Sequence, residues 1–139
     1  MQYKRIMAID YGDARIGIAL TDLLQILANP HSIYQTISEE KDIEYIANLA
    51  KQNSVEKIVI GLPLCMDGEE NDRTVKTKLF GQKLEKYSGL PVVYEDERLS
   101  SVEADEILRK NKVLPKDRKK HLDKLAAAII LQSYLNSKH

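Results

Sequence analysis

The stretch Arg5-Ile-Met-Ala-Ile-Asp10-Tyr-Gly-Asp-Ala-Arg15-Ile-Gly-Ile-Ala-Leu-Thr-Asp22 predicts two neighbouring strands at the start of the chain. Residues 5–10 and 15–22 are rich in aliphatic and β-branched side chains, which is typical of buried strands. The four residues between them, Tyr-Gly-Asp-Ala, favour a tight turn. We therefore expect the first two strands to pair as an antiparallel hairpin.

Short strands and helices alternate along the rest of the chain. A hairpin followed by alternating strands and helices predicts an α/β fold whose mixed sheet is antiparallel on one side, parallel on the other and covered by helices. The predicted elements are a weaker strand at 32–35, a helix capped by Ser38, a strand at 57–61, a helix at 72–88 stopped by Gly89, a strand at 91–95, a helix at 100–110 and a last, longest helix after Pro115-Lys-Asp117.

Two of these helices carry a recognisable apolar face in the sequence. Val75, Leu79 and Leu84 are the apolar positions of the helix at 72–88. In the last helix the expected buried face consists of Leu122, Leu125, Ala126 and Ile129.

Length and composition exclude several classes of protein. The 139 residues predict one domain spanning 1–139, and 21 basic against 21 acidic side chains argue against a globally basic nucleic-acid coat protein. The single cysteine, Cys65, excludes a disulfide scaffold and a zinc ribbon. The longest apolar run, Leu125 to Leu131, is far shorter than a membrane helix. We expect a cytoplasmic protein with no membrane partner.

Carboxylates stand at three places where a purely structural role does not require them. Asp10 ends the first strand, Asp96 and Glu97 end the strand at 91–95, and Asp123 lies early in the last helix. Ligands of α/β sheets bind outside the carboxyl ends of the strands. Acids gathered there repel one another unless a cation lies among them, and oxygen ligands favour Mg²⁺ or Mn²⁺. Taken singly, each acid also fits a turn, a solvated strand end or a helix ion pair.

The charges are segregated along the second half of the chain. Residues 94–106 hold six acidic and one basic side chain, whereas residues 107–124 hold eight basic and two acidic ones. A nuclease needs this combination, because acids hold the metal and cations hold the phosphate backbone. The alternative is a lysine-rich helix face that is merely solvated.

Four motifs together resemble the YqgF (RuvX) family, a bacterial group with an RNase H-like fold once described as Holliday junction resolvases. The resemblance extends from near residue 5 to near residue 135. The motifs are Asp10-Tyr-Gly12-Asp-Ala-Arg15-Ile-Gly17-Ile-Ala, Gly61-Leu-Pro63-Leu-Cys-Met-Asp67-Gly68, Asp96-Glu97-Arg98-Leu-Ser-Ser101 and Asp123-Lys-Leu-Ala-Ala-Ala.

The resemblance implies a five-stranded mixed sheet, antiparallel over its first three strands and then parallel, with helices on both faces. It also implies an acidic triad for a divalent metal at Asp10, Glu97 and Asp123. Because side chains alternate along a strand, only one of Asp96 and Glu97 points inward. Asp96 therefore remains an alternative to Glu97 as the metal ligand. The family's role is 5′-end processing of the precursor of 16S ribosomal RNA. Asp13 stands where the family more often has a small or hydroxyl residue, which alters the charge at the mouth of the site.

The sequence therefore predicts a nuclease dependent on Mg²⁺ or Mn²⁺, with two ions about 4 Å apart bridged by Asp10 and a product bearing a 5′ phosphate. RNA is the expected partner, and a Holliday junction in DNA is the first alternative. The residues expected to position the nucleic-acid backbone are Arg15, Arg98, Lys116, Arg118, Lys119, Lys120 and Lys124.

Two rival readings come from other classes of protein. An actin-like sugar kinase also begins with a strand, Asp-x-Gly and a hairpin, but it needs a second domain to enclose its nucleotide. A ribosome-assembly factor that binds nucleic acid without cutting it is the non-enzymatic alternative, and it would work equally well in a chelator. The sequence sets no oligomeric state and leaves a homodimer open.

Overall fold

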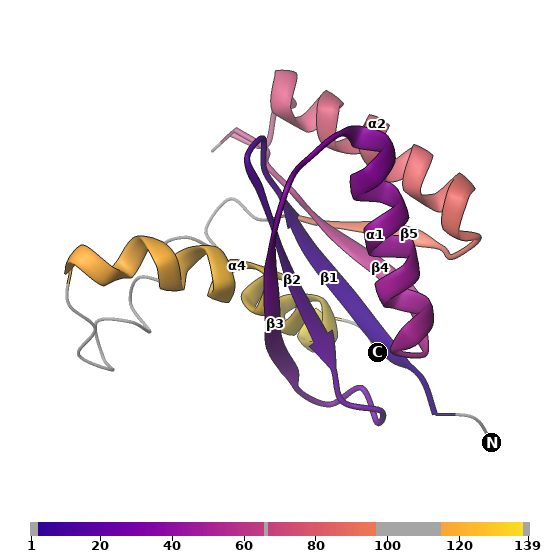
Figure 1. The fold of residues 1–139 in the computed structure, drawn as a ribbon. Helices are drawn as coiled ribbons and strands as arrows, with labels where there is room; N and C mark the ends of the chain where they lie inside the picture. The colour runs from indigo at the N-terminus through magenta and orange to yellow at the C-terminus, as the bar shows by residue number, and fades with distance from the viewer. Residues whose placement is uncertain (1–2, 66, 97–114, 138–139) are drawn as a thin grey trace.

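The structure, a computed structural model, describes residues 3–65, 67–96 and 115–137, with side chains from residue 125 onward in the last range (Figure 1). Strands and helices alternate after an initial group of three strands. In chain order the elements are β1 (Arg5–Tyr11), β2 (Arg15–Thr21), β3 (Ala28–Gln35), α1 (Glu39–Gln52), β4 (Val55–Leu62), α2 (Asp72–Ser88), β5 (Val92–Asp96) and α4 (Pro115–Ser137).

The five strands form one mixed sheet in the order β3-β2-β1-β4-β5. β1 pairs antiparallel with β2, and β2 pairs antiparallel with β3, whereas β1, β4 and β5 run parallel. The predicted α/β fold and its mixed sheet are confirmed. The central position of β1 follows from its sequence, because a strand that is covered on both faces reads as a continuous apolar run.

Alternate side chains of β1 enter two separate cores. Met7 and Ile9 pack with Ile46 of α1 and Phe80 of α2 on one face of the sheet. On the other face, Ile6 and Ala8 pack with Ala127, Ile130 and Leu131 of α4. The sheet is thus the middle layer of three, and residues of β1 with even numbers face α4.

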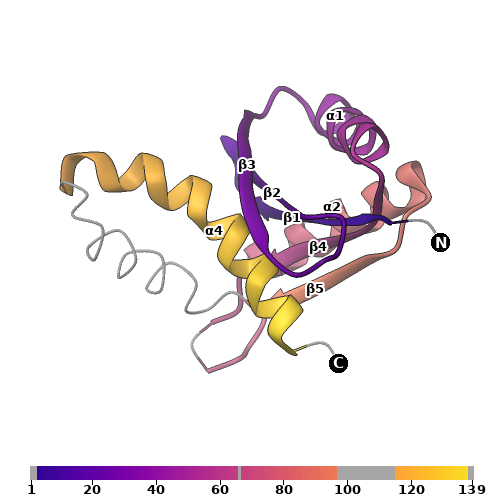
Figure 2. The same ribbon diagram turned by 90° about the horizontal axis from the view of Figure 1, so that it is seen from below.

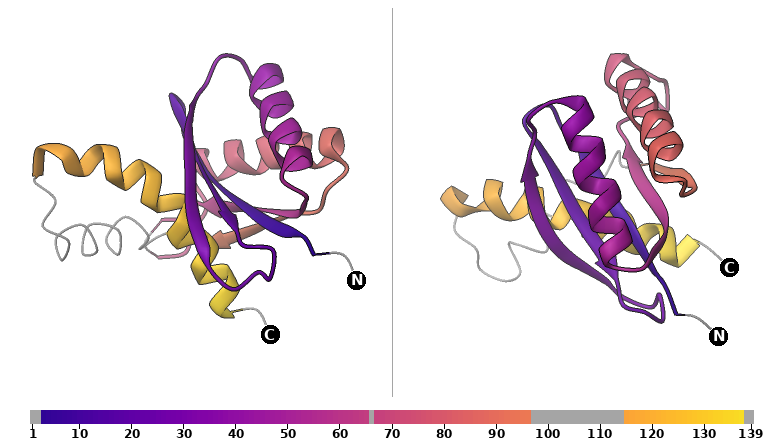
Figure 3. Two further views of the ribbon diagram at one scale, coloured as in Figure 1. Left: turned by 60° about the horizontal axis from the view of Figure 1, so that its bottom comes forward. Right: turned by 45° about the vertical axis from the view of Figure 1, so that its right-hand side comes forward.

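The views of the ribbon show this layering directly. α1 and α2 lie side by side on one face of the sheet, and α4 crosses β1, β2 and β3 on the other face (Figures 2 and 3). The N-terminal half of α4 continues beyond the sheet (Figures 1 and 2). The helix segment that carries the predicted basic residues therefore projects away from the core.

Local signals set the ends of the first two helices as predicted. The Ser38 hydroxyl accepts a hydrogen bond from the Lys41 amide at the start of α1. α2 begins with a capping box between Asn71 and Thr74 and ends at Gly89, whose φ of 74° lies in the left-handed region that favours glycine.

The buried faces of the helices match the predicted ones only in part, since Leu84 of α2 is buried as predicted but its other two apolar positions are not. Val75 and Leu79 are 50% and 51% exposed, whereas Thr74 and Thr77 of the same helix are buried. Threonine suits this face because its methyl group packs while its hydroxyl can find a partner, and that of Thr74 donates to the Pro63 carbonyl at 2.9 Å. In α4, the predicted Ala126 is buried, but Leu125 and Ile129 are only partly buried, and the most buried residues are Ala127, Ile130 and Leu131.

Two element boundaries also differ from the predictions. β3 begins at Ala28 and runs through Pro30, because an edge strand tolerates a residue without an amide hydrogen. α4 begins at Pro115, before Asp117, because proline is well suited to the first helical position. The helix predicted at 100–110 lies outside the described residues. Across the described part of the chain, no helix is both long and apolar enough to span a bilayer.

Gly81 sets how closely α2 approaches the sheet. A Cβ atom at this position would overlap the hydroxyl of Tyr94 and lie 3.1 Å from Ile60 Cδ1. We expect Gly81→Ala to lower the free energy of unfolding by about 1–3 kcal/mol, as overpacking does. Adding Tyr94→Phe removes the overlapping hydroxyl and should recover part of that loss in chemical denaturation. Additive losses in the double variant would contradict this account.

Candidate active site

Asp10 lies where β1 ends, on the face of the sheet covered by α4. Its place follows from alternation, since Ile6 and Ala8 point to the same face. The side chain is partly buried and lines an open cavity of about 280 Å³. Gly17, its partner in β2, has no side chain to fill this space. The structure therefore presents a carboxylate at the carboxyl edge of the sheet.

Arg15 and Arg73 line the same cavity as Asp10. Arg15 opens β2 on the far side of the turn, and its side chain is exposed. Arg73 comes from the first turn of α2, 58 residues after Arg15 in the chain. The fold thus brings two cations to a cavity lined also by the acids Asp10 and Asp13, and the sequence predicted Asp10 and Arg15 as site residues.

The start of α2 is tied to the end of β4. The Pro63 carbonyl accepts one hydrogen bond from the Asn71 side-chain amide and another from the Thr74 hydroxyl, both at 2.9 Å. Asn71 and Thr74 are also the two members of the capping box. The bonds that begin the helix therefore also hold its first turn, and Arg73 with it, at the edge where β1 and β4 end.

Cations from α2 clamp the β1–β2 turn. Arg73 Nη2 donates to the Tyr11 carbonyl at 3.1 Å, and Arg73 Nη1 lies 3.3 Å from Asp13 Oδ2. Lys76 Nζ lies 2.7 Å from Asp13 Oδ1. The hydrogen bond from Lys76, followed by the charges of Lys76 and Arg73, lowers the pKa of Asp13 below its ordinary value of 3.8. Asp13 therefore neutralises part of the positive charge that α2 brings to the cavity.

Tyr11 anchors the end of β1 on the opposite face. Its ring stacks on Phe80 of α2, with 4.3 Å between ring centroids and 23° between planes. Burial raises the pKa of its hydroxyl. Consecutive residues thus point to opposite layers, with Tyr11 packed against α2 and Asp10 facing the α4 side.

The same alternation separates the acids at the end of β5. Val92 and Tyr94 pack against the core beneath α1 and α2, whereas Val93 joins the core beneath α4. The Ser133 hydroxyl of α4 donates to Glu95 at 2.8 Å, as this alternation requires. Asp96, which is exposed, follows the parity of Tyr94 and belongs to the face opposite Asp10.

Two solved structures of Holliday junction resolvases share this architecture. Thermus thermophilus RuvC in complex with a Holliday junction has a TM-score of 0.55 at 12% identity, over 97% of this chain and 98% of that one. The fowlpox virus resolvase has a TM-score of 0.58 at 14% identity, over 96% and 99%. At such low identity these likenesses establish the fold, which is RuvC-like and RNase H-like.

Sequence comparison identifies the family. The family described as "RuvX: Holliday junction resolvase" matches residues 4–137. This chain belongs to the RuvX family. A relative from Halothermothrix orenii is 45% identical over 95% of this chain and 94% of its own length, and one from Syntrophus aciditrophicus is 44% identical over 96% and 89%. Both carry the name "Putative pre-16S rRNA nuclease".

Several predicted site residues of the RuvX chain fall outside this description. Glu97 and Arg98 lie outside the described residues, and Asp123 belongs to α4 by its backbone alone. Where side chains are described, no group of three Asp, Glu, His or Cys residues could hold a metal ion. Glu97 and the side chain of Asp123 lie outside that part of the chain. The other cations predicted in α4, likewise placed by backbone alone, are Lys116, Arg118, Lys119, Lys120 and Lys124.

Sequence reasoning missed Arg73 and Lys76 at the site of the RuvX chain. Both lie on the first turns of α2, spaced three residues apart so that they share a helix face. That spacing is a weak signal, because many solvated helices have it. Their role becomes visible only through the contacts of Asn71 and Thr74 with Pro63, which direct this helix start toward the β1–β2 turn.

The clamp on Asp13 predicts an order of pKa changes. Lys76→Gln should return the pKa of the Asp13 carboxyl toward 3.8 by more than Arg73→Gln does, since the Lys76 hydrogen bond is the larger cause. With a folded pKa below the unfolded one, the pair stabilises the protein above about pH 3.8 and loses this effect as the pH falls through the folded value. Carboxyl-carbon NMR across pH 2–6 measures each pKa. A larger change in Arg73→Gln would contradict the geometry.

Proposed function

We propose that this RuvX chain is a metal-dependent nuclease, a single domain spanning 1–139, that hydrolyses the backbone of pre-16S ribosomal RNA during processing of its 5′ end in the cytoplasm. The observation that carries the proposal is Asp10, a carboxylate at the carboxyl end of the central strand in an open cavity it shares with Arg15 and Arg73. Names borne by relatives at 37–45% identity over nearly the full length support the choice of substrate.

Asp10, Glu97 and Asp123 form the proposed acidic triad. The parity of β5 supports Glu97 over Asp96, because Asp96 belongs to the face opposite Asp10. Residue 123 lies one helical turn before Ala127, and Ala127 packs in the same core as Ala8, two residues before Asp10 in β1. Both arguments support a triad on the α4 side of the sheet.

The chemistry of these donors fits a hard divalent cation. Carboxylate oxygens are preferred ligands of Mg²⁺ and Mn²⁺, and Asp10 lines an open cavity of about 280 Å³, large enough to admit an ion and water. When bound, one or two such ions supply a hydroxide nucleophile and neutralise charge on the leaving 3′ oxygen. Asp10, Glu97 and Asp123 would be the residues that hold them.

Cations on both sides of the acids would hold the RNA backbone. Arg15 and Arg73 lie in the cavity itself, so they are suited to the phosphates next to the cleaved bond. The basic segment of α4, residues 116–124, continues beyond the sheet (Figure 1) and is suited to phosphates further along the strand. Backbone contacts of this kind position the substrate without reading its sequence.

A Holliday junction in DNA is the second candidate substrate. The description of the matching family and the fold shared with Thermus thermophilus RuvC, solved on such a junction, favour it. Both substrates are phosphodiesters and use the same acids, so a direct comparison decides between them. Labelled pre-16S RNA and a labelled four-way DNA junction are incubated side by side with Mg²⁺, Mn²⁺ or a chelator. RNA cleavage that the chelator abolishes is the expected result, and junction cleavage alone would replace the proposed substrate.

The first variant to test is Asp10→Asn, which keeps the shape and removes one charge. We expect cleavage to fall by at least about a hundredfold, the scale for removing one key electrostatic group. The thermal midpoint without metal should stay level or rise, because a cluster of like charges loses a member. Glu85→Gln, an exposed change on α2, is the matched control. Full activity in a folded Asp10→Asn protein would leave a binding factor as the better description.

The basic start of α4 predicts a change in salt dependence. Each lysine on a phosphate adds about 0.7–0.9 to the slope of log affinity against log salt. Lys119→Ala with Lys120→Ala should therefore reduce that slope by up to about two units in a filter-binding titration. The same slope as in the unmodified protein would identify this segment as a solvated helix face.

A further inference from the structure

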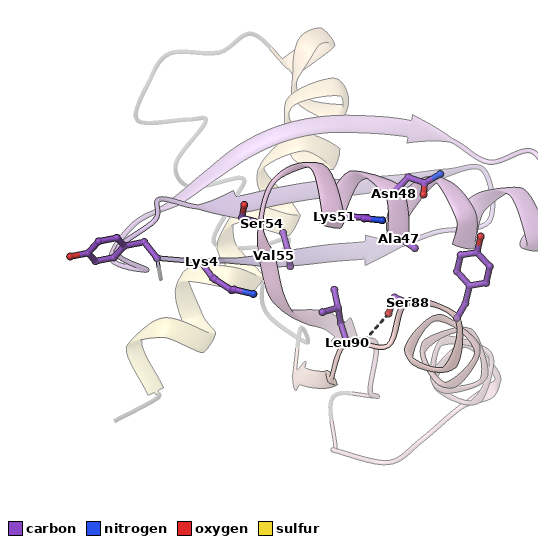
Figure 4. A pocket seen from close by; sticks show the side chains of 10 residues that line it. Lys4, Ala47, Asn48, Lys51, Ser54, Val55, Ser88 and Leu90 are labelled. Carbon is purple, nitrogen blue, oxygen red and sulfur yellow. Dashed lines mark hydrogen bonds between the residues drawn. The ribbon is translucent and has the colours of Figure 1, made fainter. Parts of the chain in front are cut away.

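A larger pocket lies at the opposite edge of the sheet from Asp10. Its volume is about 780 Å³, within the range of small-ligand sites, and it opens where β1 and β4 begin and α1 and α2 end. Figure 4 shows Lys4 from the segment before β1 and Lys51 from α1 around Val55, with Ser88 at the end of α2 and Leu90 on the connection to β5. The pocket is lined by Tyr3, Lys4, Ala47, Asn48, Lys51, Ser54, Val55, Tyr87, Ser88 and Leu90.

The side-chain charges that line this pocket are all positive. Lys4 and Lys51 supply two cations, and no acidic side chain lines the pocket. Within the described residues neither lysine takes part in an ion pair, whereas Lys76, Lys78 and Lys83 on α2 each contact a carboxylate. Two lysines without counter-charges beside one cavity favour an anionic ligand.

Two exposed tyrosines flank the lysines. Tyr3 is 55% exposed and Tyr87 is 59% exposed. In the described part of the chain, neither ring stacks on another aromatic ring, in contrast to the Tyr11–Phe80 pair. Exposed aromatic rings next to cations are the elements with which proteins bind single-stranded nucleic acid, because bases stack on the rings while the cations contact phosphates.

The ends of the neighbouring helices do not account for this set of residues. Lys51 complements the negative end of the α1 dipole, which is an ordinary structural role. The carbonyls at that end already accept bonds from Asn53, and the Glu85 carbonyl accepts one from Gly89. Lys4 and the two tyrosines belong to neither helix cap, so helix stabilisation leaves them unexplained.

We propose that this pocket, defined by Tyr3, Lys4, Lys51 and Tyr87, is a second binding site for single-stranded RNA. The site binds a flank of the substrate at a distance from the cleaved bond. This part of the inference rests on the proposed nuclease function. Two bases stack on the tyrosines, and the lysines contact the phosphates between them.

The length of β1 sets the reach that a substrate needs. Lys4 and Asp10 are six residues apart, which corresponds to about 20 Å along a strand. A stacked strand rises about 3.4 Å per nucleotide, so the straight distance alone corresponds to about six nucleotides. The flank must be longer than this, because Asp10 faces the α4 layer whereas the pocket lies at the ends of α1 and α2. Shorter substrates occupy the active site alone.

Binding without cleavage tests the site directly. The probe is a fluorescent 12-nucleotide oligouridine, titrated in a chelator with anisotropy as the readout. Lys4→Gln with Lys51→Gln should reduce the salt slope by about 1.4, which is 0.7 for each phosphate contact. Tyr87→Ala should weaken binding roughly tenfold at constant salt, since stacking on one base is lost. Both changes are expected in proteins whose thermal midpoints match that of the unmodified chain.

A matched double variant controls for net charge. Lys78→Gln with Lys83→Gln removes the same number of positive charges from α2 outside the pocket. This variant should reduce the salt slope by less than half of the reduction expected for Lys4→Gln with Lys51→Gln. Equal slopes in the two double variants would overturn the proposal, because the effect would then be one of net charge. Undiminished oligouridine binding by Tyr87→Ala would overturn it as well, and would direct attention to a protein partner for this surface.

Flank length separates this inference from the proposed function. Cleavage is measured on RNA with flanks of three or twelve nucleotides on each side of the cleaved bond. In the variant with Lys4→Gln and Lys51→Gln, kcat/KM should fall several-fold for the long substrate and stay unchanged for the short one. Failure of the unmodified protein to cut either RNA would refute the nuclease proposal while the binding result stands. Cutting of both substrates at the normal rate by the variant would refute the second site alone.

Discussion

The alternation of side chains along β1 is the constraint on which the rest of the structure depends. This strand is hydrogen-bonded on both sides and covered on both faces, so every side chain from Ile6 to Ile9 is committed to one of two cores. A shift of register by one residue would move Met7 and Ile9 into the layer of α4 and turn Asp10 toward α2. The packing of the core therefore determines from which face of the sheet the Asp10 side chain projects, and no bound ligand is needed for this.

Much of the fold could be predicted because its signals are local. The aliphatic runs flanking Gly12 predict the hairpin, and Ser38 and Gly89 mark helix ends by their own backbone preferences. The errors arise where tertiary packing decides. Thr77 is buried although its hydroxyl makes it look like a surface residue, and Val75 is half exposed although it looks like a core residue. Which face of a helix is buried depends on the sheet surface against which the helix packs. The polarity of a single residue is therefore a poor guide to its burial.

The candidate site shows the same division. Asp10 and Arg15 flank one turn, so a single stretch of sequence is sufficient to find both. Arg73 reaches that turn because the start of α2 donates hydrogen bonds to the Pro63 carbonyl. These bonds join segments that are distant in the sequence, so no local sequence pattern predicts them. The sequence left open whether Asp96 or Glu97 is the inward acid, and the proposal for Glu97 rests on the parity of β5, for which Tyr94 and Val93 first had to be assigned to their layers.

The outer strand β3 has a consequence for assembly. An edge strand exposes unpaired backbone groups that invite another chain to extend the sheet. Here the exposed Pro30 removes one amide hydrogen from that edge, and the pairing of β3 with β2 is irregular between Ile18 and Ala19. Such features interrupt a continuous ladder and protect against edge-to-edge aggregation. A homodimer built by pairing two β3 edges is accordingly disfavoured, and two copies of this chain can lie close together without their sheets joining along this strand.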